Sequence, residues 1–377
     1  MTVAVPRLGT PQKARKDLYR RFCDRLVTNE RLDRTLVSFQ ANRKLPYYRW
    51  LKYKEGFSAR FVEYVIEELT SSCGVLLDPF AGTGTALFAA RKLGWDTIGV
   101  ELLPVGFFAA EARLAADCVD AREFERKVAQ TISITWEDYY SPRWRLDHAP
   151  ITLGAFSEAT ERSIVGYRAY CARMRNAHIR TLFQLACFSI LEEVSYTRKD
   201  GQYLRWDQRA GKPRVSSTFD KGPIPDFDST IRRKLAEISS DLLNGVTTGL
   251  FETPKARHKL GMLDLRRGSC LEILPDLADE SVDLVVTSPP YCNRYDYTRT
   301  YALELVYLGT GAEDIKRLRQ ELLSCTVENR TKLDQLHCFY QNRGAQHVCD
   351  SVVDVFSRQG ALQEALVILQ NYGSCGK

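Results

Sequence analysis

Two short motifs follow buried hydrophobic runs, and both contain residue types that could bind or activate a ligand. The first, Asp-Pro-Phe-Ala-Gly-Thr-Gly-Thr at 78–85, follows the apolar run 73–77. The second, Thr-Ser-Pro-Pro-Tyr at 287–291, follows the apolar run 282–286. A glycine-rich turn lets a ligand approach the backbone, and adjacent prolines make a rigid corner of carbonyl groups. The sequence therefore predicts two ligand-contacting corners at strand ends.

The glycine-rich motif is predicted to bind a cofactor with positive charge. It lacks the Gly-Lys-Ser/Thr of a P-loop, and Leu87 stands where a dinucleotide motif has its third glycine. Asp78 places a carboxylate at the strand end, which suits the ammonium and sulfonium of S-adenosylmethionine. Glu101 ends the next strand, about 20 residues beyond the loop, where it can accept ribose hydroxyls. Taken alone, the motif could also be a tight strand-to-helix turn.

The proline motif suits the activation of an aromatic amine. The lone pair of a nucleobase amine is delocalised into the ring, so the nitrogen must become more tetrahedral before it attacks a methyl group. Acceptors fixed around its N–H bonds favour that geometry. Pro289 and Pro290 supply carbonyls without competing N–H donors, Ser288 adds an oxygen, and Tyr291 can stack on the base. Taken alone, this motif could also be a helix-initiating proline turn.

The segments around the motifs predict an open parallel sheet. We expect buried-type strands at four places, which are 73–77, 95–101, 261–270 and 282–286. The helical composition of 86–94 makes a β-α-β unit with the first two strands, and such units bind ligands at the carboxyl ends of the strands. We therefore predict an α/β fold with a Rossmann-like sheet, its strands ordered 3-2-1-4 and possibly incomplete.

The central part of the chain is predicted to be an insertion. From about residue 105 helical patterns dominate, over a stretch too long for a simple crossover. The expected divisions are an N-terminal helical and cofactor-side segment (1–72), the first part of the sheet domain (73–104), a mainly helical insertion (105–257), the second part of the sheet domain (258–330) and a helical C-terminal segment (331–377).

Composition restricts the class of protein. The chain has 377 residues and a formal net charge of +6, which is compatible with a polyanionic partner without requiring one. The 11 cysteines are scattered singly, without zinc-type spacing, so we predict reduced thiols in a cytoplasmic protein and no metal centre. No apolar run approaches the roughly 20 residues that span a bilayer. We therefore expect no membrane segment.

Together the two motifs resemble those of the S-adenosylmethionine-dependent DNA amino-methyltransferases, which modify N4 of cytosine or N6 of adenine. The resemblance implies that the first motif binds the cofactor and the second holds the target amine. The implied cofactor residues are Asp78, Phe80, Ala81, Gly82, Gly84 and Glu101, with Ser269 and Cys270 near the adenine. The implied catalytic residues are Ser288, Pro289, Pro290 and Tyr291. Serine at 288 is commonest among the N4-cytosine enzymes and favours cytosine.

The same resemblance implies a base-flipping enzyme of a restriction-modification system, with DNA as its partner. Residues 45–57 lie where the family keeps a cofactor-side segment, and the insertion stands as a target-recognition region. Its basic loop 195–214 suits phosphate contacts and stacking. The nucleic-acid-binding candidates there are Arg198, Lys199, Tyr203, Arg205, Trp206 and Arg209, with Lys212 and Arg214. A solvated basic loop would explain these residues too.

The residues after Tyr291 depart from the family pattern. They predict helices at 301–309, 312–323 and 360–372, where the family's sheet needs further strands. We therefore expect a truncated or split enzyme whose strand 282–286 is an unpaired edge, and a second chain or self-association that completes the sheet there. The alternatives are methylation of RNA or of a protein amide, and a non-catalytic nucleic-acid-binding remnant.

Overall fold

The computed structural model describes residues 11–27, 29–53, 56–200, 203–210, 219–251, 260–288, 296–322 and 333–347, with 350, 351, 354 and 358. The chain divides into two compact units. The larger unit consists of Arg31–Pro289 and Asp296–Leu322 and contains the sheet and the helical insertion. The described helices of the smaller unit are α1 (Pro11–Phe22), η1 (Cys23–Arg25) and α14 (Leu333–Asn342).

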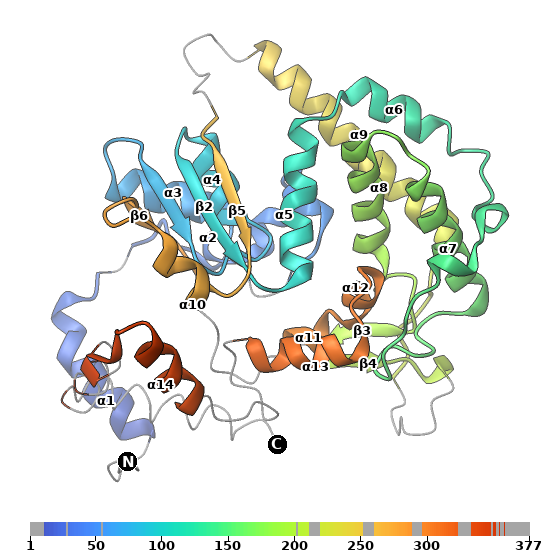
Figure 1. Cartoon of the computed structure of the whole chain (residues 1–377). Coiled ribbons are helices and arrows are strands. Elements are labelled where there is room, and N and C mark those ends of the chain that lie inside the picture. Colours follow the sequence, from blue (N-terminus) through green and yellow to red (C-terminus); the bar gives the residue numbers. More distant parts are fainter. Residues whose placement is uncertain are drawn as a thin grey trace. The chain divides into compact units, whose positions relative to one another are not determined.

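A parallel sheet organises one half of the larger unit. Its strands are β1 (Val75–Asp78), β2 (Asp96–Glu101), β5 (Leu263–Arg267) and β6 (Leu284–Val285), in the spatial order β5-β2-β1-β6 (Figure 1). Leu77 pairs with Ile98 on one side and with Val285 on the other. The carboxyl ends of the strands therefore lie at one edge. This arrangement confirms the predicted α/β fold and the 3-2-1-4 order of the four strands.

Short apolar helices support the sheet. Helix α3 (Ala59–Leu69) packs on α4 (Thr85–Lys92), which packs on β1 and β2. Ser58 begins α3 by accepting a hydrogen bond from the N–H of Phe61, and Gly94 turns the chain after α4 with a φ of +88°. The buried core here is mostly small or aliphatic: Val62, Ile66, Leu76, Ala86, Leu87, Trp95 and Val286. This core holds the strand ends that carry both motifs.

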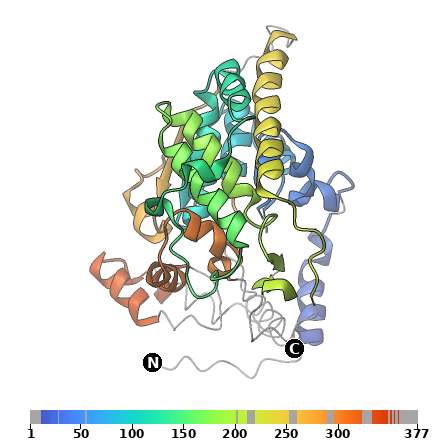
Figure 2. The ribbon, with the colours of Figure 1, turned by 90° about the vertical axis from the view of Figure 1, so that its right-hand side faces the viewer.

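A helical region makes up the rest of the larger unit. Helix α5 (Pro104–Asp117) contacts β2 and β5 and also packs on α8, so it lies between the sheet and the other helices (Figure 1). Those helices are α6 (Ala121–Ala129), α7 (Glu158–Ala172), α8 (Ala177–Ile190) and α9 (Phe227–Phe251). Figure 2 shows α9 running along α8. Their core is rich in aromatic side chains, as the buried Trp136, Tyr167 and Phe183 show. The mainly helical insertion is as predicted.

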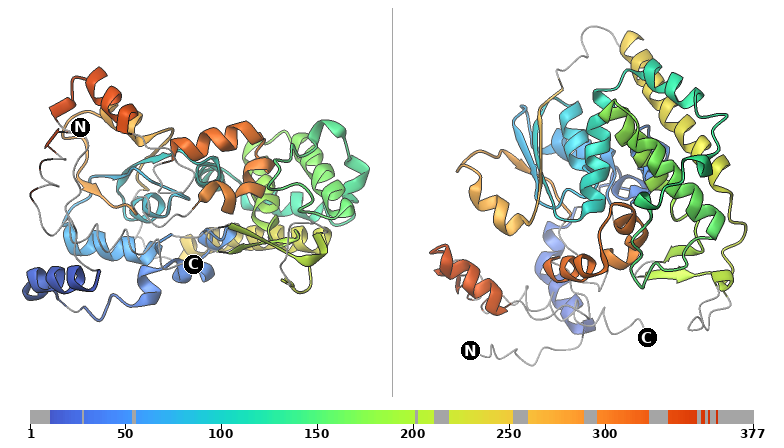
Figure 3. Two further views of the ribbon diagram at one scale, coloured as in Figure 1. Left: turned by 90° about the horizontal axis from the view of Figure 1, so that it is seen from below. Right: turned by 45° about the vertical axis from the view of Figure 1, so that its right-hand side comes forward.

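A hairpin stands where the sequence predicts a basic loop. Strands β3 (Thr197–Asp200) and β4 (Tyr203–Trp206) pair antiparallel. Along β3 the side chains alternate between buried and exposed, as the period of a strand requires. Helices α11 (Tyr297–Thr300), α12 (Ala302–Tyr307) and α13 (Ala312–Glu321) follow the second motif, and α11 contacts β4 (Figure 3). They confirm two of the three predicted late helices, and 360–372 lies outside the described residues.

Short elements complete the described structure: α2 (Arg34–Val37), η2 (Phe39–Lys44), η3 (Tyr48–Trp50), η4 (Trp136–Tyr139), η5 (Pro142–Trp144), η6 (Gln208–Ala210), α10 (Cys270–Ile273) and η8 (Leu274–Asp276). Among the described residues no helix is long and apolar enough to cross a bilayer. The same residues contain no group of three or more His, Cys, Asp or Glu side chains that could hold a metal ion.

Candidate functional site

The glycine loop is a tight turn between β1 and α4. Gly82 and Gly84 have φ values of +53° and +77°, in the left-handed region that favours glycine. A Cβ at Gly84 would lie only 2.8 Å from the ring of Phe88. Ala81 and Gly84 are buried, whereas Phe80 and Gly82 are partly exposed. The loop therefore has the shape of a tight turn and also offers backbone to a ligand.

Asp78 ties the glycine loop to the second motif. Its side chain is almost fully buried, and Oδ1 accepts hydrogen bonds from Thr287 Oγ1 at 2.7 Å and from the N–H of Phe80 at 3.1 Å. Burial raises the pKa of Asp78 to about 6, against the lowering effect of these two hydrogen bonds. Its other oxygen, Oδ2, makes no hydrogen bond within the described residues. That atom is the one left for a cationic ligand.

Glu101 closes the other side of the loop. Its Oε2 accepts a hydrogen bond from the N–H of Gly82, and its Oε1 accepts one from the N–H of Leu103, each at 2.6 Å. Burial raises the pKa of Glu101 to about 7, although both hydrogen bonds act in the opposite direction. The predicted ribose acceptor thus lies at the correct strand end. In this structure its carboxylate is bonded to the loop backbone.

Ser269 and Cys270 lie at the neighbouring strand end. The N–H of Gly268, the first residue after β5, donates to the carbonyl of Glu101 at 3.1 Å. Ser269 caps α10 by accepting a hydrogen bond from the N–H of Leu271, and Cys270 is buried. The predicted cofactor residues are therefore brought together along the carboxyl ends of β1, β2 and β5.

The amine motif begins directly beyond β6. Thr287 and Ser288 belong to the described residues, and Thr287 provides the hydrogen bond to Asp78. Pro289, Pro290 and Tyr291 lie outside the described residues. The predicted amine pocket as a whole therefore stays a prediction. Its starting point is fixed beside the glycine loop.

Comparisons with known proteins agree with this arrangement. The N6/N4 methyltransferase family model, described as DNA methylase, matches residues 12–105. The chain is 43% identical over 319 residues to the Type II methyltransferase M.AvaI of Nostoc sp. strain PCC 7120, covering 84% of this chain and 65% of that protein. It is 38% identical over 347 residues to the Type II methyltransferase M.BsoBI of Geobacillus stearothermophilus, covering 88% of this chain and 66% of that protein.

These similarities support the assignment of the chain to the N6/N4 DNA methylase family. It spans 65% and 66% of the length of the two relatives just named. A shorter stretch of 63 residues is 40% identical to the Type II methyltransferase M.ScaI of Streptomyces caespitosus. No solved structure matches the chain.

In this chain an aromatic segment ahead of the glycine loop packs against the loop. A Cβ at Gly82 would lie 3.4 Å from the ring of Tyr53. The Tyr53 ring stacks on that of Tyr301, with centroids 5.0 Å apart and an angle of 12° between the planes. The family resemblance predicts only that 45–57 is a cofactor-side segment. Tyr53 could not be singled out, because nothing local distinguishes this ring from its aromatic neighbours.

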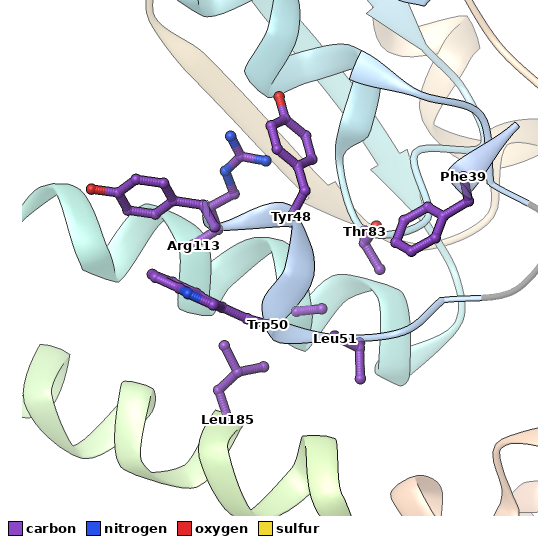
Figure 4. Close-up of a pocket in the computed structure, with 9 residues that line it drawn as sticks. Phe39, Tyr48, Trp50, Leu51, Thr83, Arg113 and Leu185 are labelled. Carbon is purple, nitrogen blue, oxygen red and sulfur yellow. The ribbon is translucent and has the colours of Figure 1, made fainter. Parts of the chain in front are cut away.

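A small pocket lies between this segment, Thr83 of the glycine loop, α5 and α8 (Figure 4). Its lining residues are Phe39, Tyr47, Tyr48, Trp50, Leu51, Thr83, Ala109, Arg113 and Leu185. Its volume of about 20 Å³ accommodates a single water molecule. The Arg113 guanidinium lies 3.7 Å from the ring centroid of Tyr48, and Asp241 of α9 accepts a hydrogen bond from Trp50 Nε1 at 2.8 Å. The pocket is too small for a cofactor, and its walls fix the aromatic segment.

The hairpin separates the basic candidates into two groups. Arg198 and Arg205 are exposed and stand directly opposite each other in the register of β3 and β4. Lys199 is buried beside Glu304 of α12. Arg209 donates two hydrogen bonds to the buried Asp207, at 2.7 and 2.8 Å. Arg198 and Arg205 thus face solvent and Lys199 is buried, whereas Arg209 is exposed but bonded to Asp207 within the fold.

Two aromatic candidates belong to the same hairpin. Trp206 is partly buried and pairs with Thr197, and Tyr203 pairs with Asp200. Lys212 and Arg214 lie outside the described residues. Contact of any of these side chains with nucleic acid stays a prediction.

Proposed function

We propose that this methylase transfers a methyl group from S-adenosylmethionine to the exocyclic amine of a flipped DNA base, with N4 of cytosine preferred. One observation carries the proposal. The hydrogen bond between Asp78 and Thr287 joins the glycine loop to the first residue of the amine motif. Two motifs far apart in sequence thus start from adjacent strand ends, where open α/β sheets bind their ligands. The similarity to Type II methyltransferases supports DNA as the substrate.

The residues at the strand ends fit this cofactor. Gly82 and Gly84 leave the loop backbone without side chains, and Asp78 keeps Oδ2 available for a positive group. Ionised Glu101 would accept ribose hydroxyls, after releasing the N–H of Gly82, and Ser269 would stand near the adenine. When bound, S-adenosylmethionine supplies a methyl group activated by a positively charged sulfur. The loop would hold that group against the second motif.

The second motif would prepare the amine. Ser288 and the carbonyls of Pro289 and Pro290 would accept hydrogen bonds from its N–H groups, which favours the more tetrahedral nitrogen. Tyr291 would stack on the base. Flipping the base out of the duplex costs a few kcal/mol, and alignment of the reacting atoms then contributes most of the acceleration. The displaced proton can leave to water. Serine at 288 supports cytosine, with N6 of adenine as the second candidate.

The outward face of the hairpin would contact DNA. Like charges directly opposite each other on paired strands are unfavourable unless an anion lies nearby. Arg198 and Arg205 form such a pair. Arg205 lies 3.7 Å from the carboxylate of Asp200, whereas Arg198 makes no ion pair among the described residues. A phosphate group between them would relieve the repulsion. This supports a target-recognition role for the insertion, in the setting of a restriction-modification system.

The test is to incubate the purified full chain with labelled S-adenosylmethionine and unmethylated DNA, then digest the DNA and analyse nucleosides by mass spectrometry. N4-methylcytosine is the expected product. N6-methyladenine would retain the mechanism and correct the base. A parallel Asp78→Asn variant should give little product. Absence of product from the wild type, with cofactor bound, would contradict activity of this chain alone and direct the assay to RNA, to a protein amide or to a second chain.

A further inference from the structure

The hairpin buries one charged side chain. Lys199 faces inward from β3, where its Nζ lies 2.5 Å from Glu304 Oε1 on α12 and 4.5 Å from the ring centroid of Tyr301. The side chains of Lys199 and Glu304 are only 4% and 2% exposed. This ion pair therefore joins the hairpin to the helices that follow the amine motif.

Stability alone is a poor explanation of the pair. Desolvation of two charges offsets most of their attraction. A protein with an apolar pair of similar volume in the same place is therefore commonly at least as stable. The site is also incompletely satisfied, because Glu304 Oε2 and Thr300 Oγ1 are buried without hydrogen-bond partners in the described structure. The two buried charges therefore indicate that the ion pair holds the hairpin and α12 in position rather than stabilising the fold.

A continuous set of contacts leads from this pair to the glycine loop. Tyr301, which lies beneath the Lys199 ammonium, stacks on Tyr53, and Tyr53 lies against Gly82. The same segment is anchored at its beginning. Asp296 is the first described residue after the amine motif, and its carboxylate is 3.0 Å from Arg319 Nε on α13. A shift of the hairpin would therefore move Tyr301 and, through Tyr53, the glycine loop.

We propose that Lys199 and Glu304 are positioning residues that couple the hairpin to the glycine loop and to the anchor of the amine motif. When DNA engages Arg198 and Arg205 on the outer face, the inner face of the same strand holds Glu304 and Tyr301 in the arrangement that supports methyl transfer. This inference rests on the proposed function, because the outer face is taken to bind DNA. It adds a route by which DNA binding at the hairpin affects methyl transfer at the glycine loop.

The experiment compares full-length variants that separate folding from coupling. Lys199→Met leaves a buried carboxylate without its partner, which destabilises the fold. The double variant Lys199→Met with Glu304→Leu removes both charges and is expected to restore the melting temperature. Arg233→Met is the matched control, since it breaks an exposed ion pair with Glu193 in the same helical region. Each variant is assayed for DNA affinity, for single-turnover methyl transfer and for amide hydrogen exchange across 297–305 with and without duplex DNA.

The double variant decides the inference. We expect wild-type melting temperature and DNA affinity, about a 10-fold or greater fall in the single-turnover rate constant, and loss of the DNA-induced protection of 297–305. A double variant with the wild-type rate and protection would overturn the coupling. If the wild type binds DNA without methylating it, the proposed function fails, and the exchange comparison still decides the coupling. If DNA protects 297–305 equally in both proteins, the pair serves the fold alone.

Discussion

The cofactor edge of the sheet and the hairpin of the insertion handle their charges in opposite ways. At the cofactor edge, Asp78 and Glu101 turn inward and accept hydrogen bonds from the chain itself. On the hairpin, Arg198 and Arg205 turn outward and face each other. Buried carboxyls respond to protons, whereas exposed arginines respond to salt. The two regions should therefore be separable by pH and by ionic strength.

The largest expected effect is the response of folding stability to pH. The folded-state pKa values of Asp78 and Glu101, about 6 and about 7, lie above the ordinary values of 3.8 and 4.5. Their contribution to stability is thus fully present below about pH 4 and is lost as the pH rises through about 6 to 7. At about 1.4 kcal/mol per pKa unit, each carboxyl contributes about 3 kcal/mol to this change. Urea unfolding of the wild type between pH 4 and 8 measures it.

Asp78→Asn and Glu101→Gln should each flatten that pH profile, because the amide does not titrate. Unfolding profiles with the wild-type slope in both variants would contradict the assignment of these two groups. Cofactor affinity should change with pH in the opposite direction to folding stability, since the ionised carboxylates of Asp78 and Glu101 bind the cofactor. Affinity for S-adenosylmethionine, measured by calorimetry, is therefore expected to rise between pH 5.5 and 8.

The next effect concerns Tyr291, which lies outside the described residues. Its proposed stacking on the flipped base is worth about 1–3 kcal/mol, or about 5- to 150-fold in rate if it acts in the transition state. Tyr291→Ala should therefore slow methyl transfer and leave cofactor affinity unchanged. Tyr291→Phe, which keeps the ring, is the matched control. Equal losses of transfer and of cofactor affinity in a folded Tyr291→Ala protein would exclude the stacking role.

Thr287 should matter through Asp78. Thr287→Val removes the hydrogen bond to a buried carboxylate, which costs about 1–3 kcal/mol and disfavours its ionised form. Weaker cofactor binding at pH 7 and a smaller deficit at pH 8.5 are expected in calorimetry. Thr287→Ser keeps the hydroxyl and should behave like the wild type. If the serine and valine variants lose affinity equally, the hydroxyl is not the cause.

The contrast between the two regions also shows what the sequence predicts well. The four strands, their order and the residues of the glycine loop could be predicted because apolar runs and turn glycines are local signals. The hydrogen bond between Thr287 and Asp78 could not, because it depends on the exact register of β1 and β6. The burial of Lys199 was missed for a related reason. Arg198 before it carries the same charge, and only the pairing of β3 with β4 decides which of these side chains faces inward.

The smallest expected effect is on the salt dependence of DNA affinity, and it concerns the outer face of the hairpin. Arg198→Ala and Arg205→Ala should each reduce the slope of log affinity against log salt by about 1, since each removes one phosphate contact. Arg209→Ala is the informative control. Its guanidinium is bonded to Asp207, so this change should lower the melting temperature and leave the salt slope unaltered. Fluorescence anisotropy of a labelled duplex across a salt series measures all three. If Arg209→Ala changes the slope as much as Arg198→Ala does, the bonds of Arg209 to Asp207 do not keep it from DNA, and the DNA contact extends beyond Arg198 and Arg205.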